Sequence, residues 1–416
     1  MVRRAGEYDA VIVGASLAGC TAAILLGRGG ARVALVEKSP DPGAFKRICS
    51  HMVQASGVPT LERLDLLEAI VAAGGIRSRL RFWTEWGWVE APPERAAQGV
   101  NLRRELLDPI VREAAAATAG VELMLGHEAV RLLRDGDAVR GVAVRDRDGV
   151  DADLRATLVV GADGRESHVA ELAGVPAKTL PHGRFAYASY FENPSGSLDS
   201  SVWFLDPQIS AAFPTDGGLV LYVAMQTKDR LPEFRRDPKA ALLASVAAIP
   251  ESSTRPGREV GPLLGKLQMP NRVRGPVAPG LALIGDAALA TDPLFGVGCG
   301  WAFQSGAWLA DCVAPALHGA EPLQKGLARY RRRHRRELRG HAFFIHDYAN
   351  GRRFNPIEKL AFFAAARDPE LATMFDAYAT RQIRPTQMFA KTIPRTIAVA
   401  AREALPHRGG GVPASR

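Results

Sequence analysis

The chain has 416 residues, of which 47% are hydrophobic and 23% are charged. This composition excludes a disordered or fibrous protein, and the length suggests one large domain with a second one inserted or appended. Much of the formal net charge of +9 comes from one run, residues 329–339, which we interpret as a solvated helix face. No zinc-finger, helix-turn-helix or aromatic RNA-binding signature accompanies it, so we expect no nucleic-acid partner.

The four cysteines are scattered, without a CxxC pair or a Cys/His spacing suited to zinc. We therefore expect no metal site and reduced thiols. Neither a basic-then-apolar leader nor an apolar run of bilayer length is visible, which favours a cytoplasmic location. Contact with a membrane surface is left open and is not predicted.

The first part of the chain predicts a parallel sheet. An apolar run at 8–13 ends in glycine and precedes a small-residue segment at 16–26, which indicates strand, turn and helix. A second apolar run at 32–36 completes a βαβ unit. After a loop rich in Pro, Gly and Ser, we expect a helix over 61–72 and a strand over 80–91.

Helix and strands then alternate up to residue 160. The segment 101–119 predicts a helix in which Asp108 caps a second segment with Pro109 in its first turn. Three strand-like stretches follow it, divided by Asp-Gly turns, at 121–125, 138–145 and 154–160.

The pattern changes at residue 180. Residues 180–228 alternate, are rich in aromatic side chains and are divided by turn residues, which predicts an antiparallel sheet inserted into the first domain. The parallel-strand pattern returns at 281–286, before a glycine-rich loop and a helix over 301–318. Residues 340–405 predict several helices, and we expect 407–416 to be disordered. The expected fold class is therefore α/β.

The turn between the first strand and helix carries a phosphate-binding pattern. Residues 14–19 read Gly-Ala-Ser-Leu-Ala-Gly. We expect Gly14 to allow the tight turn and Gly19 to allow close packing of helix on strand. Ser16, Leu17 and Ala18 would begin the helix, whose free N–H groups suit a pyrophosphate. Ser16 replaces the middle glycine of the strict GxGxxG pattern, and its hydroxyl suits a phosphate.

An acidic residue stands at the end of the second strand. Glu37 follows the glycine turn at roughly the 20-residue spacing of dinucleotide-binding proteins, and Lys38 comes next. We expect Glu37 to accept a hydrogen bond from a ribose 2′-OH. Strand, turn, helix and acid together predict a dinucleotide site.

Two later segments identify the dinucleotide. Residues 159–167 read Val-Val-Gly-Ala-Asp-Gly-Arg-Glu-Ser, and 283–288 read Leu-Ile-Gly-Asp-Ala-Ala, followed at 292–298 by Asp-Pro-Leu-Phe-Gly-Val-Gly. They resemble the second and third fingerprints of the p-hydroxybenzoate hydroxylase (group A) superfamily of FAD-dependent monooxygenases, in that family's order. The resemblance assigns these residues to FAD: Asp163, Gly164, Gly285, Asp286, Pro293, Gly296, Val297 and Gly298.

Two arginines extend the resemblance. Arg47 occupies the family's position for an arginine that contacts the cofactor's phosphates. Arg104 looks like the arginine of the family's RxxLD helix, which reaches the FAD. His51, just after Arg47, is a candidate catalytic residue for a flavin-side or substrate-side polar contact, and Cys49 and Cys299 are assigned no redox role.

The resemblance divides the chain. It implies a Rossmann-like FAD-binding domain with an inserted mixed or antiparallel β-sheet substrate domain and a C-terminal helical region. The boundaries we expect are 1–175 for the FAD-binding domain, with a short substrate-domain excursion at 76–100, then 176–275 for the substrate-binding sheet, 276–335 for the return to the FAD-binding domain, 336–405 for the helical region and 406–416 for the tail.

The implied activity is that of a monooxygenase, either a hydroxylase or an epoxidase. In the resembling family, NAD(P)H visits transiently to reduce FAD, and reduced flavin and O2 then give a C4a-hydroperoxyflavin that oxygenates the substrate. The strands of the inserted sheet predict a pocket for a hydrophobic or aromatic small molecule, with Trp203, Phe213 and Pro214 in its wall. A separate flavin reductase is an alternative electron donor.

Other activities stay open. The segment 292–298 looks nearer to the geranylgeranyl reductase and halogenase branches, so the main alternative is a flavin-dependent reductase of an isoprenoid or polyene. A halogenase is a lesser alternative, because the GWxWxIP signature is missing. A noncatalytic flavin-binding interaction protein is suggested only by the basic run at 329–339.

Overall fold

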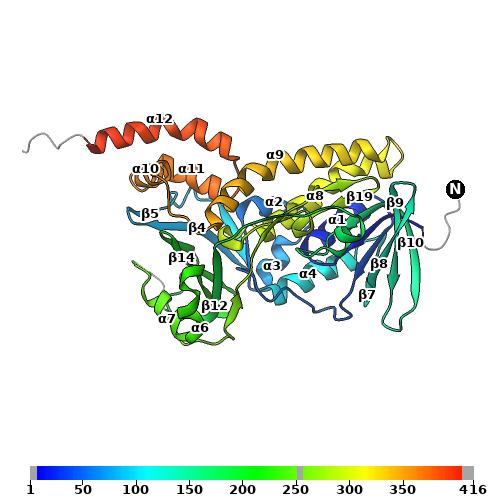
Figure 1. The fold of residues 1–416 in the computed structure, drawn as a ribbon, viewed down its shortest axis with the longest axis horizontal. Helices are drawn as coiled ribbons and strands as arrows, with labels where there is room; N and C mark the ends of the chain where they lie inside the picture. Colours follow the sequence, from blue (N-terminus) through cyan, green and yellow to red (C-terminus); the bar gives the residue numbers. More distant parts are fainter. Residues whose placement is uncertain (1–6, 251–255, 405–416) are drawn as a thin grey trace, which may run out of the picture.

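The structure is a computed structural model that describes residues 7–250 and 256–404. The molecule is elongated: a β/α domain lies at one end, a second sheet with two helices lies at the other, and the C-terminal helices run along one side (Figure 1). The tail expected at 406–416 lies outside the described residues. None of the described helices combines the length and apolar character needed to cross a bilayer.

The β/α domain is built on a mixed sheet, which has eight strands within the described residues. Its centre is parallel, in the order β19-β10-β1-β2-β7, while β18, β9 and β8 add antiparallel strands at the edges. The strands are β1 (Glu7–Val13), β2 (Val33–Glu37), β7 (Val121–Leu125), β8 (Glu128–Asp135), β9 (Ala138–Arg145), β10 (Asp151–Gly161), β18 (Val277–Ala278) and β19 (Leu281–Leu283).

Both faces of this sheet are buried. Alternate residues of β1, such as Ile12 and Val11, point to opposite faces, as strand geometry requires. Ile12 packs with the helices, and Val11 packs with the β8–β9 hairpin and α5. The helices associated with this domain are α1 (Leu17–Arg28), α2 (Val58–Arg63), α3 (Leu67–Ala72), α4 (Arg104–Ala116), α5 (His168–Leu172) and α8 (Gly298–Leu317).

The inserted sheet has nine strands within the described residues and is mixed, since β13 and β4 pair in parallel. Two helices, α6 (Leu231–Arg236) and α7 (Pro238–Ala247), cover one of its faces. Its strands are β3 (Met52–Val53), β4 (Ile76–Thr84), β5 (Gly87–Val89), β6 (Gln98–Asn101), β12 (Arg184–Glu192), β13 (Ser200–Leu205), β14 (Gln208–Thr215), β15 (Leu219–Thr227) and β16 (Leu264–Lys266). The strands in 76–100 thus belong to the inserted sheet, as does β3, which precedes that segment.

A small third sheet joins the two domains. It consists of β11 (Lys178–Leu180), β17 (Asn271–Val273) and β20 (Leu289–Ala290). The C-terminal helices α9 (Leu323–Ala349), α10 (Pro356–Ala365), α11 (Pro369–Ala379) and α12 (Pro385–Ala404) complete the chain.

The predicted fold class is confirmed, with local corrections. The helix expected over 61–72 is two short helices, α2 and α3, because Asp65 between them has a φ of 58°. The helix expected from residue 101 begins at Arg104, because β6 pairs with β4 up to Asn101. The expected cap at Asp108 is wrong: α4 runs continuously through Pro109.

The crossing of α8 over α1 requires a glycine. A Cβ at Gly306 would lie 2.6 Å from the carbonyl oxygen of Ala18 and 3.0 Å from the Cβ of Thr21. In the same helix, a Cβ at Gly300 would meet only the hydroxyl of Ser56, at 3.9 Å. The two glycines therefore form a matched pair of sites, one crowded and one open.

We predict that Gly306→Ala lowers the free energy of unfolding by about 2 kcal/mol, because the added methyl overpacks the helix crossing. Gly300→Ala is expected to raise it by up to about 1 kcal/mol through helix propensity. Urea denaturation of both variants measures the difference, and equal stability of the two would contradict the described crossing.

Candidate functional site

The glycine turn brings the first strand and helix against the second fingerprint. Gly14 has a φ of 107°, and a Cβ there would lie 2.5 Å from the carbonyl oxygen of Ala162, at the end of β10. A Cβ at Gly19 would lie 1.9 Å from the carbonyl oxygen of Gly14. Only glycine fits either position, so the turn is compact and the start of α1 stays close to the strand ends.

The start of α1 has N–H groups that no side chain caps. Ser16 stands at the N-cap, but its hydroxyl makes no capping hydrogen bond and instead accepts one from Nη2 of Arg104, at 3.0 Å. Leu17 and Ala18 are buried in the first turn. Uncapped N–H groups and the positive end of the helix dipole suit a pyrophosphate. This observation fits the ADP half of FAD.

Glu37 lies beside this turn. Its carboxylate accepts hydrogen bonds from the N–H groups of Ala15 and Ser39, both at 2.9 Å. Each carboxylate oxygen keeps another lone pair, so the group can still accept from a ribose hydroxyl. Lys38 and Arg47 are exposed, and no polar contact fixes the Arg47 side chain within the described residues. Phosphate binding by Arg47 stays a prediction.

Helix α4 contributes two buried arginines. Arg104 pairs with Asp108, with 2.6 Å between nitrogen and oxygen. Arg112, two turns later, donates to the carbonyl oxygens of Ala15 and Ala44, at 3.0 and 2.8 Å, and also to that of Pro42. Arg112 thereby ties the loop at 42–44 to the glycine turn. Sequence reasoning missed Arg112, although its spacing from Arg104 places both on related faces of one helix.

The second fingerprint closes the far side of the turn. The carboxylate of Asp163 accepts from the hydroxyl of Ser167 at 2.5 Å and from the N–H of Val169 at 2.9 Å. Gly164 has a φ of 85° with open space around its Cα. Asp163 therefore organises the start of α5, and a direct contact between Asp163 and the cofactor stays a prediction.

The third fingerprint joins the first through Gly285. A Cβ at Gly285 would lie 3.0 Å from the Cβ of Ala18, and its N–H donates to the hydroxyl of Ser305 at 2.9 Å. Asp286 forms a salt bridge of 3.1 Å with Lys46. Burial alone would raise the pKa of Asp286, but the cations Lys46 and Arg165 lower it. The carboxylate is therefore ionised at neutral pH, as a hydrogen-bond acceptor for a ribityl hydroxyl requires.

The loop before α8 turns tightly. Pro293 begins a single turn of 3-10 helix, and Gly296 ends it with a φ of 62°. A Cβ at Gly296 would lie 3.0 Å from Cε of Met52. Val297 is buried, whereas Gly298, the first residue of α8, has no neighbour within 4 Å of a built Cβ. The uncapped start of α8 therefore borders open space and can stabilise negative charge on a bound flavin ring.

Two cysteines meet beside Arg104. The sulfur atoms of Cys49 and Cys299 lie 3.6 Å apart, and Nη1 of Arg104 lies 3.9 and 3.8 Å from them. The Cys299 thiol donates to Cys49 and lowers the pKa of Cys49, burial opposes this, and Arg104 lowers it further. Cys49 is therefore the member of the pair that ionises first. This pair could not be predicted from the sequence, because 250 positions separate its members.

His51 is held in one tautomer. Its Nδ1 accepts from the backbone N–H of Arg104 at 3.1 Å, so a neutral ring carries its proton on Nε2. That nitrogen forms a hydrogen bond with the hydroxyl of Tyr190. Burial lowers the pKa of His51, which favours the neutral ring. Tyr190 was missed by sequence reasoning, and only the pairing of distant elements reveals it.

The three residues expected in the pocket wall do not share one face of the inserted sheet. Phe213 lies on the face that packs with Met52 and Leu294, beside the third-fingerprint loop. Trp203 lies on the other face, under α6 and α7, where its Nε1 donates to the carbonyl oxygen of Pro250 at 3.0 Å. The assignment of Trp203 to the pocket is therefore not supported. Pro214 is buried, and its carbonyl oxygen accepts from Asn101 at 2.8 Å.

The face that carries Phe213 is rich in aromatic side chains. Phe204 of β13 contacts Phe295 of the third-fingerprint loop, with ring centroids 6.2 Å apart, and Tyr348 of α9 at the same distance. Phe354 and Phe362 extend this cluster into the C-terminal helices. The inner face of the sheet and the C-terminal helices thus surround the loop with buried apolar side chains.

Asp292 is a buried carboxyl within this apolar region. It is 0% exposed, its Oδ1 accepts from the N–H of Leu294 at 3.0 Å, and its Oδ2 has no partner among the described residues. Burial raises the pKa of Asp292 to about 6, against the lowering effects of the Leu294 N–H and Arg184. Asp292 is thus a second candidate for holding a proton near the third fingerprint.

The chain matches a known protein family. A family model described as an FAD binding domain matches residues 7–341. The chain belongs to this family, and it is an FAD-dependent oxidoreductase. The resemblance to the p-hydroxybenzoate hydroxylase superfamily is confirmed.

Relatives of more than one activity are similar to this chain. A digeranylgeranylglycerophospholipid reductase from Picrophilus torridus is 27% identical over 335 residues, which are 78% of this chain and 82% of that protein. The ubiquinone hydroxylase UbiL from Rhodospirillum rubrum is 29% identical over 334 residues, 76% of this chain and 74% of that protein. The solved structure of a flavoprotein/dehydrogenase from Cytophaga hutchinsonii shares the fold, with a TM-score of 0.79 at 16% identity, covering 95% of this chain and 100% of that one.

We predict that iodoacetamide alkylates Cys49 fastest of the four thiols. The pH at which its alkylation rate is half-maximal should lie below the usual thiol pKa of about 8.5. Burial raises the pKa of Cys20, to about 12, and also that of Cys312. Cys299→Ala should move the Cys49 midpoint upward, because the S–H donor is lost, and Cys312→Ala is the matched control. Quantitative mass spectrometry across pH measures the rates, and an unmoved midpoint would contradict the lowering of the Cys49 pKa by Cys299.

We predict that Asp292→Asn gains stability over the wild type as pH rises. Because the pKa of Asp292 is raised in the folded state, the protonated carboxyl stabilises the folded wild type. This stabilisation is lost as pH increases through about 6. As pH rises from about 4 to about 7, the stability of Asp292→Asn relative to the wild type should increase by roughly 3 kcal/mol, because the pKa is shifted by about two units. Urea denaturation across pH measures it. Exposed Asp148→Asn is the control, and a pH-independent difference for Asp292→Asn would refute the assignment.

Proposed function

We propose that this oxidoreductase is a monooxygenase, a hydroxylase or epoxidase, that acts on a hydrophobic or aromatic small molecule with NAD(P)H and O2. The observation that carries the proposal is the buried cluster of apolar and aromatic side chains, including Phe213 and Phe295, that adjoins the uncapped start of α8. An apolar surface with a few convergent polar groups suits a hydrophobic substrate. The similarity to a ubiquinone hydroxylase supports the same reaction class.

Bound FAD would supply the electrons and the activation of oxygen, which protein side chains do not provide. The start of α1 and Glu37 would bind the ADP half, and Asp286 would hold the ribityl chain. The start of α8 would favour negative charge beside the ring. These roles need no protein nucleophile, only binding, orientation and the exclusion of water.

Proton handling falls to His51 and Tyr190. The neutral His51 ring, fixed by the Arg104 N–H, presents its Nε2 proton to the Tyr190 hydroxyl. Burial raises the pKa of Tyr190 to about 12, so the hydroxyl stays protonated at neutral pH. The pair can hold a proton beside the site and pass it on through the tyrosine hydroxyl.

A second candidate is a flavin-dependent reductase that saturates an isoprenoid or polyene. It is favoured by the similarity to digeranylgeranylglycerophospholipid reductases over about four-fifths of the chain. An isoprenoid chain would bind beside the same apolar cluster. The two candidates differ in their need for oxygen, and this difference decides between them.

We predict that turnover of a hydrophobic substrate consumes O2 and places one labelled oxygen atom in the product when 18O2 is supplied. The holoenzyme is tested with NADH, NADPH and a flavin reductase against a panel of aromatic and isoprenoid compounds, and mass spectrometry measures the products. Anaerobic turnover that adds two hydrogen atoms and no label would overturn the monooxygenase proposal and support the reductase.

A further inference from the structure

The last helix presents apolar side chains to solvent. Phe389, Ile393 and Ile397 of α12 are 38%, 53% and 58% exposed. They are spaced four residues apart, which places them on one stripe along the helix. Thr392 and Thr396, which each precede one of these isoleucines, are only 4% and 9% exposed. The helix thus buries two threonines and exposes the isoleucines beside them, which is the reverse of the usual arrangement.

The exposed stripe is broad. Small apolar residues continue it around the helix, and all of them are exposed: Ala390, Pro394, Ala398 and Ala401. At 100° per residue, the charged residues of this helix fall outside the arc that these positions span. Lys391 and Arg402 lie beyond one edge of this arc, and Glu403 lies beyond the other. A wide apolar arc with basic side chains along an edge is typical of a helix that lies in the interface of a membrane.

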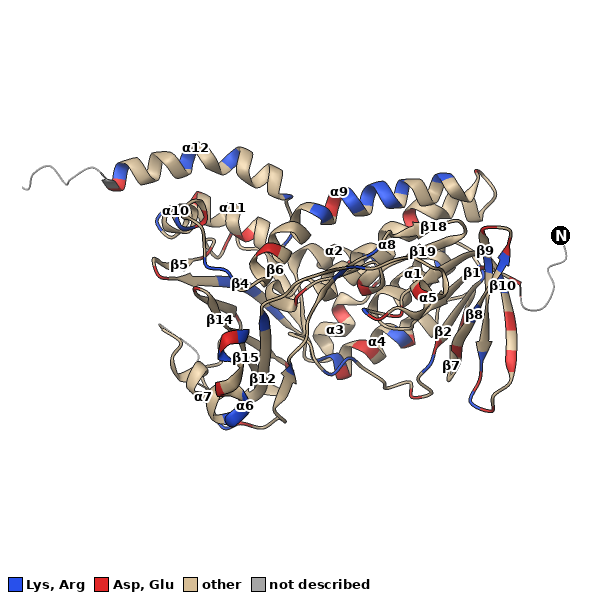
Figure 2. Cartoon of the chain, viewed as in Figure 1, with Lys and Arg blue, Asp and Glu red and all other residues tan. Residues whose placement is uncertain are grey.

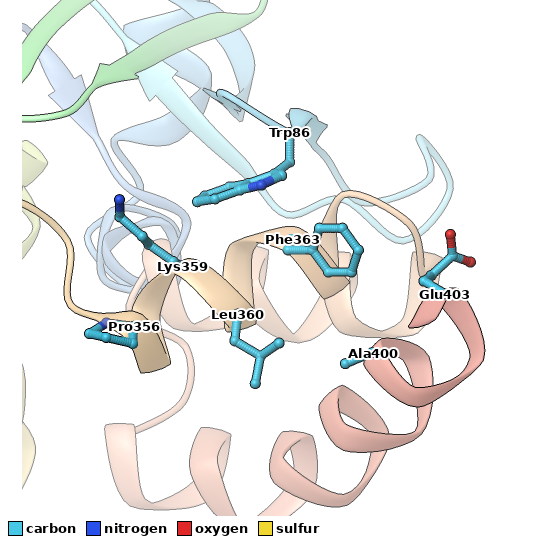
Figure 3. Close-up of a pocket in the computed structure, with 7 residues that line it drawn as sticks. All are labelled: Trp86, Pro356, Lys359, Leu360, Phe363, Ala400 and Glu403. Carbon is cyan, nitrogen blue, oxygen red and sulfur yellow. The ribbon is translucent and has the colours of Figure 1, made fainter. Parts of the chain in front are cut away.

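The apolar surface extends beyond α12 at both ends. Toward α9, the Phe389 ring lies 5.6 Å from Phe344, which in turn lies 5.4 Å from Phe343, a residue that is 64% exposed. Toward α10, Ala400 lines a shallow surface hollow with Trp86 and Leu360, whose side chains are drawn in Figure 3. An apolar surface therefore runs from the end of α9 along α12 to α10, where Lys359 and Glu403 border it.

Helix α9 adds positive charge next to this surface. Arg332, Arg336 and Arg339 are exposed and lie on the same face of the helix as Phe343, at spacings of four, three and four residues. Only Arg336 has an ion-pair partner within the described part of the chain, the neighbouring Glu337. Figure 2 shows these basic bands on α9 and others on α12, along the same side of the molecule.

We infer that this surface, made of the exposed faces of α9 and α12, docks on an anionic lipid bilayer. The apolar arc of α12 would enter the acyl boundary while the arginines of α9 contact the lipid headgroups, so that two weak attractions act together. A lipid surface fits better than a second copy of the chain, because a symmetric pairing of this face would place the basic side chains of both copies in one interface.

The test is co-sedimentation of the full-length holoenzyme with vesicles of phosphatidylcholine alone, or with a quarter of the lipid replaced by phosphatidylglycerol. We expect binding to the anionic vesicles that weakens as salt is added. The double variant Ile393→Ser and Ile397→Ser should bind at least about tenfold more weakly, because the buried apolar area is lost. The double variant Arg332→Gln and Arg339→Gln should also lose about tenfold or more.

Matched controls carry equal changes elsewhere. Val150→Ser with Leu198→Ser removes two exposed apolar side chains, 61% and 55% exposed, and Arg235→Gln with Arg236→Gln removes two exposed arginines of α6. Both controls should bind as the wild type does. Equal loss in variants and controls would overturn the inference. So would self-association of the wild type, seen by sedimentation velocity and abolished by the isoleucine changes, without any vesicle binding.

Discussion

One buried guanidinium holds the candidate site together. Arg104 is 3% exposed and pairs with Asp108 within its own helix. It also donates to Ser16 at the start of α1 and borders the sulfurs of Cys49 and Cys299, while its backbone N–H fixes the tautomer of His51. Burying a charge is costly unless hydrogen bonds satisfy it, so these partners are constrained to stay where the guanidinium reaches them.

One consequence is that the start of α4 links the two domains. Helix α4 begins directly after β6 of the inserted sheet and packs against α1 of the β/α domain. The first residue of α4 therefore positions both the turn suited to the pyrophosphate and the histidine that faces Tyr190 of the inserted sheet. Such a link between a cofactor-binding domain and a substrate domain can hold cofactor and substrate in a fixed relative position.

Local motifs were predictable, and pairings between distant segments were not. The glycine turn, Glu37 and the later fingerprints are each set by a few adjacent residues, so the sequence predicted the fold class and the order of its parts. The face on which Trp203 lies depends on the register of β13, and a shift of one residue reverses it. The meeting of Cys49 with Cys299 depends on how a loop and a helix start pack.

The exposed surface of α9 and α12 and the apolar region beneath it are formed by the same helices. Both use the C-terminal helices: one side of α9 contributes Tyr348 to the aromatic cluster, while its outer side carries arginines and Phe343. The basic run that we interpreted as a solvated face does lie on an exposed helix face, yet it adjoins apolar side chains. The same group of helices would then contact both a hydrophobic substrate and a lipid surface.

The central claim is that the glycine turn and the start of α1 bind the ADP half of FAD. Calorimetric titration of the apoprotein with FAD and with FMN tests it directly, since FMN carries the same ring and ribityl phosphate but no ADP. We expect one FAD bound per chain and FMN binding at least about a hundredfold weaker, a loss of about 3 kcal/mol or more. Equal affinity for the two flavins, or no binding of FAD, would contradict it.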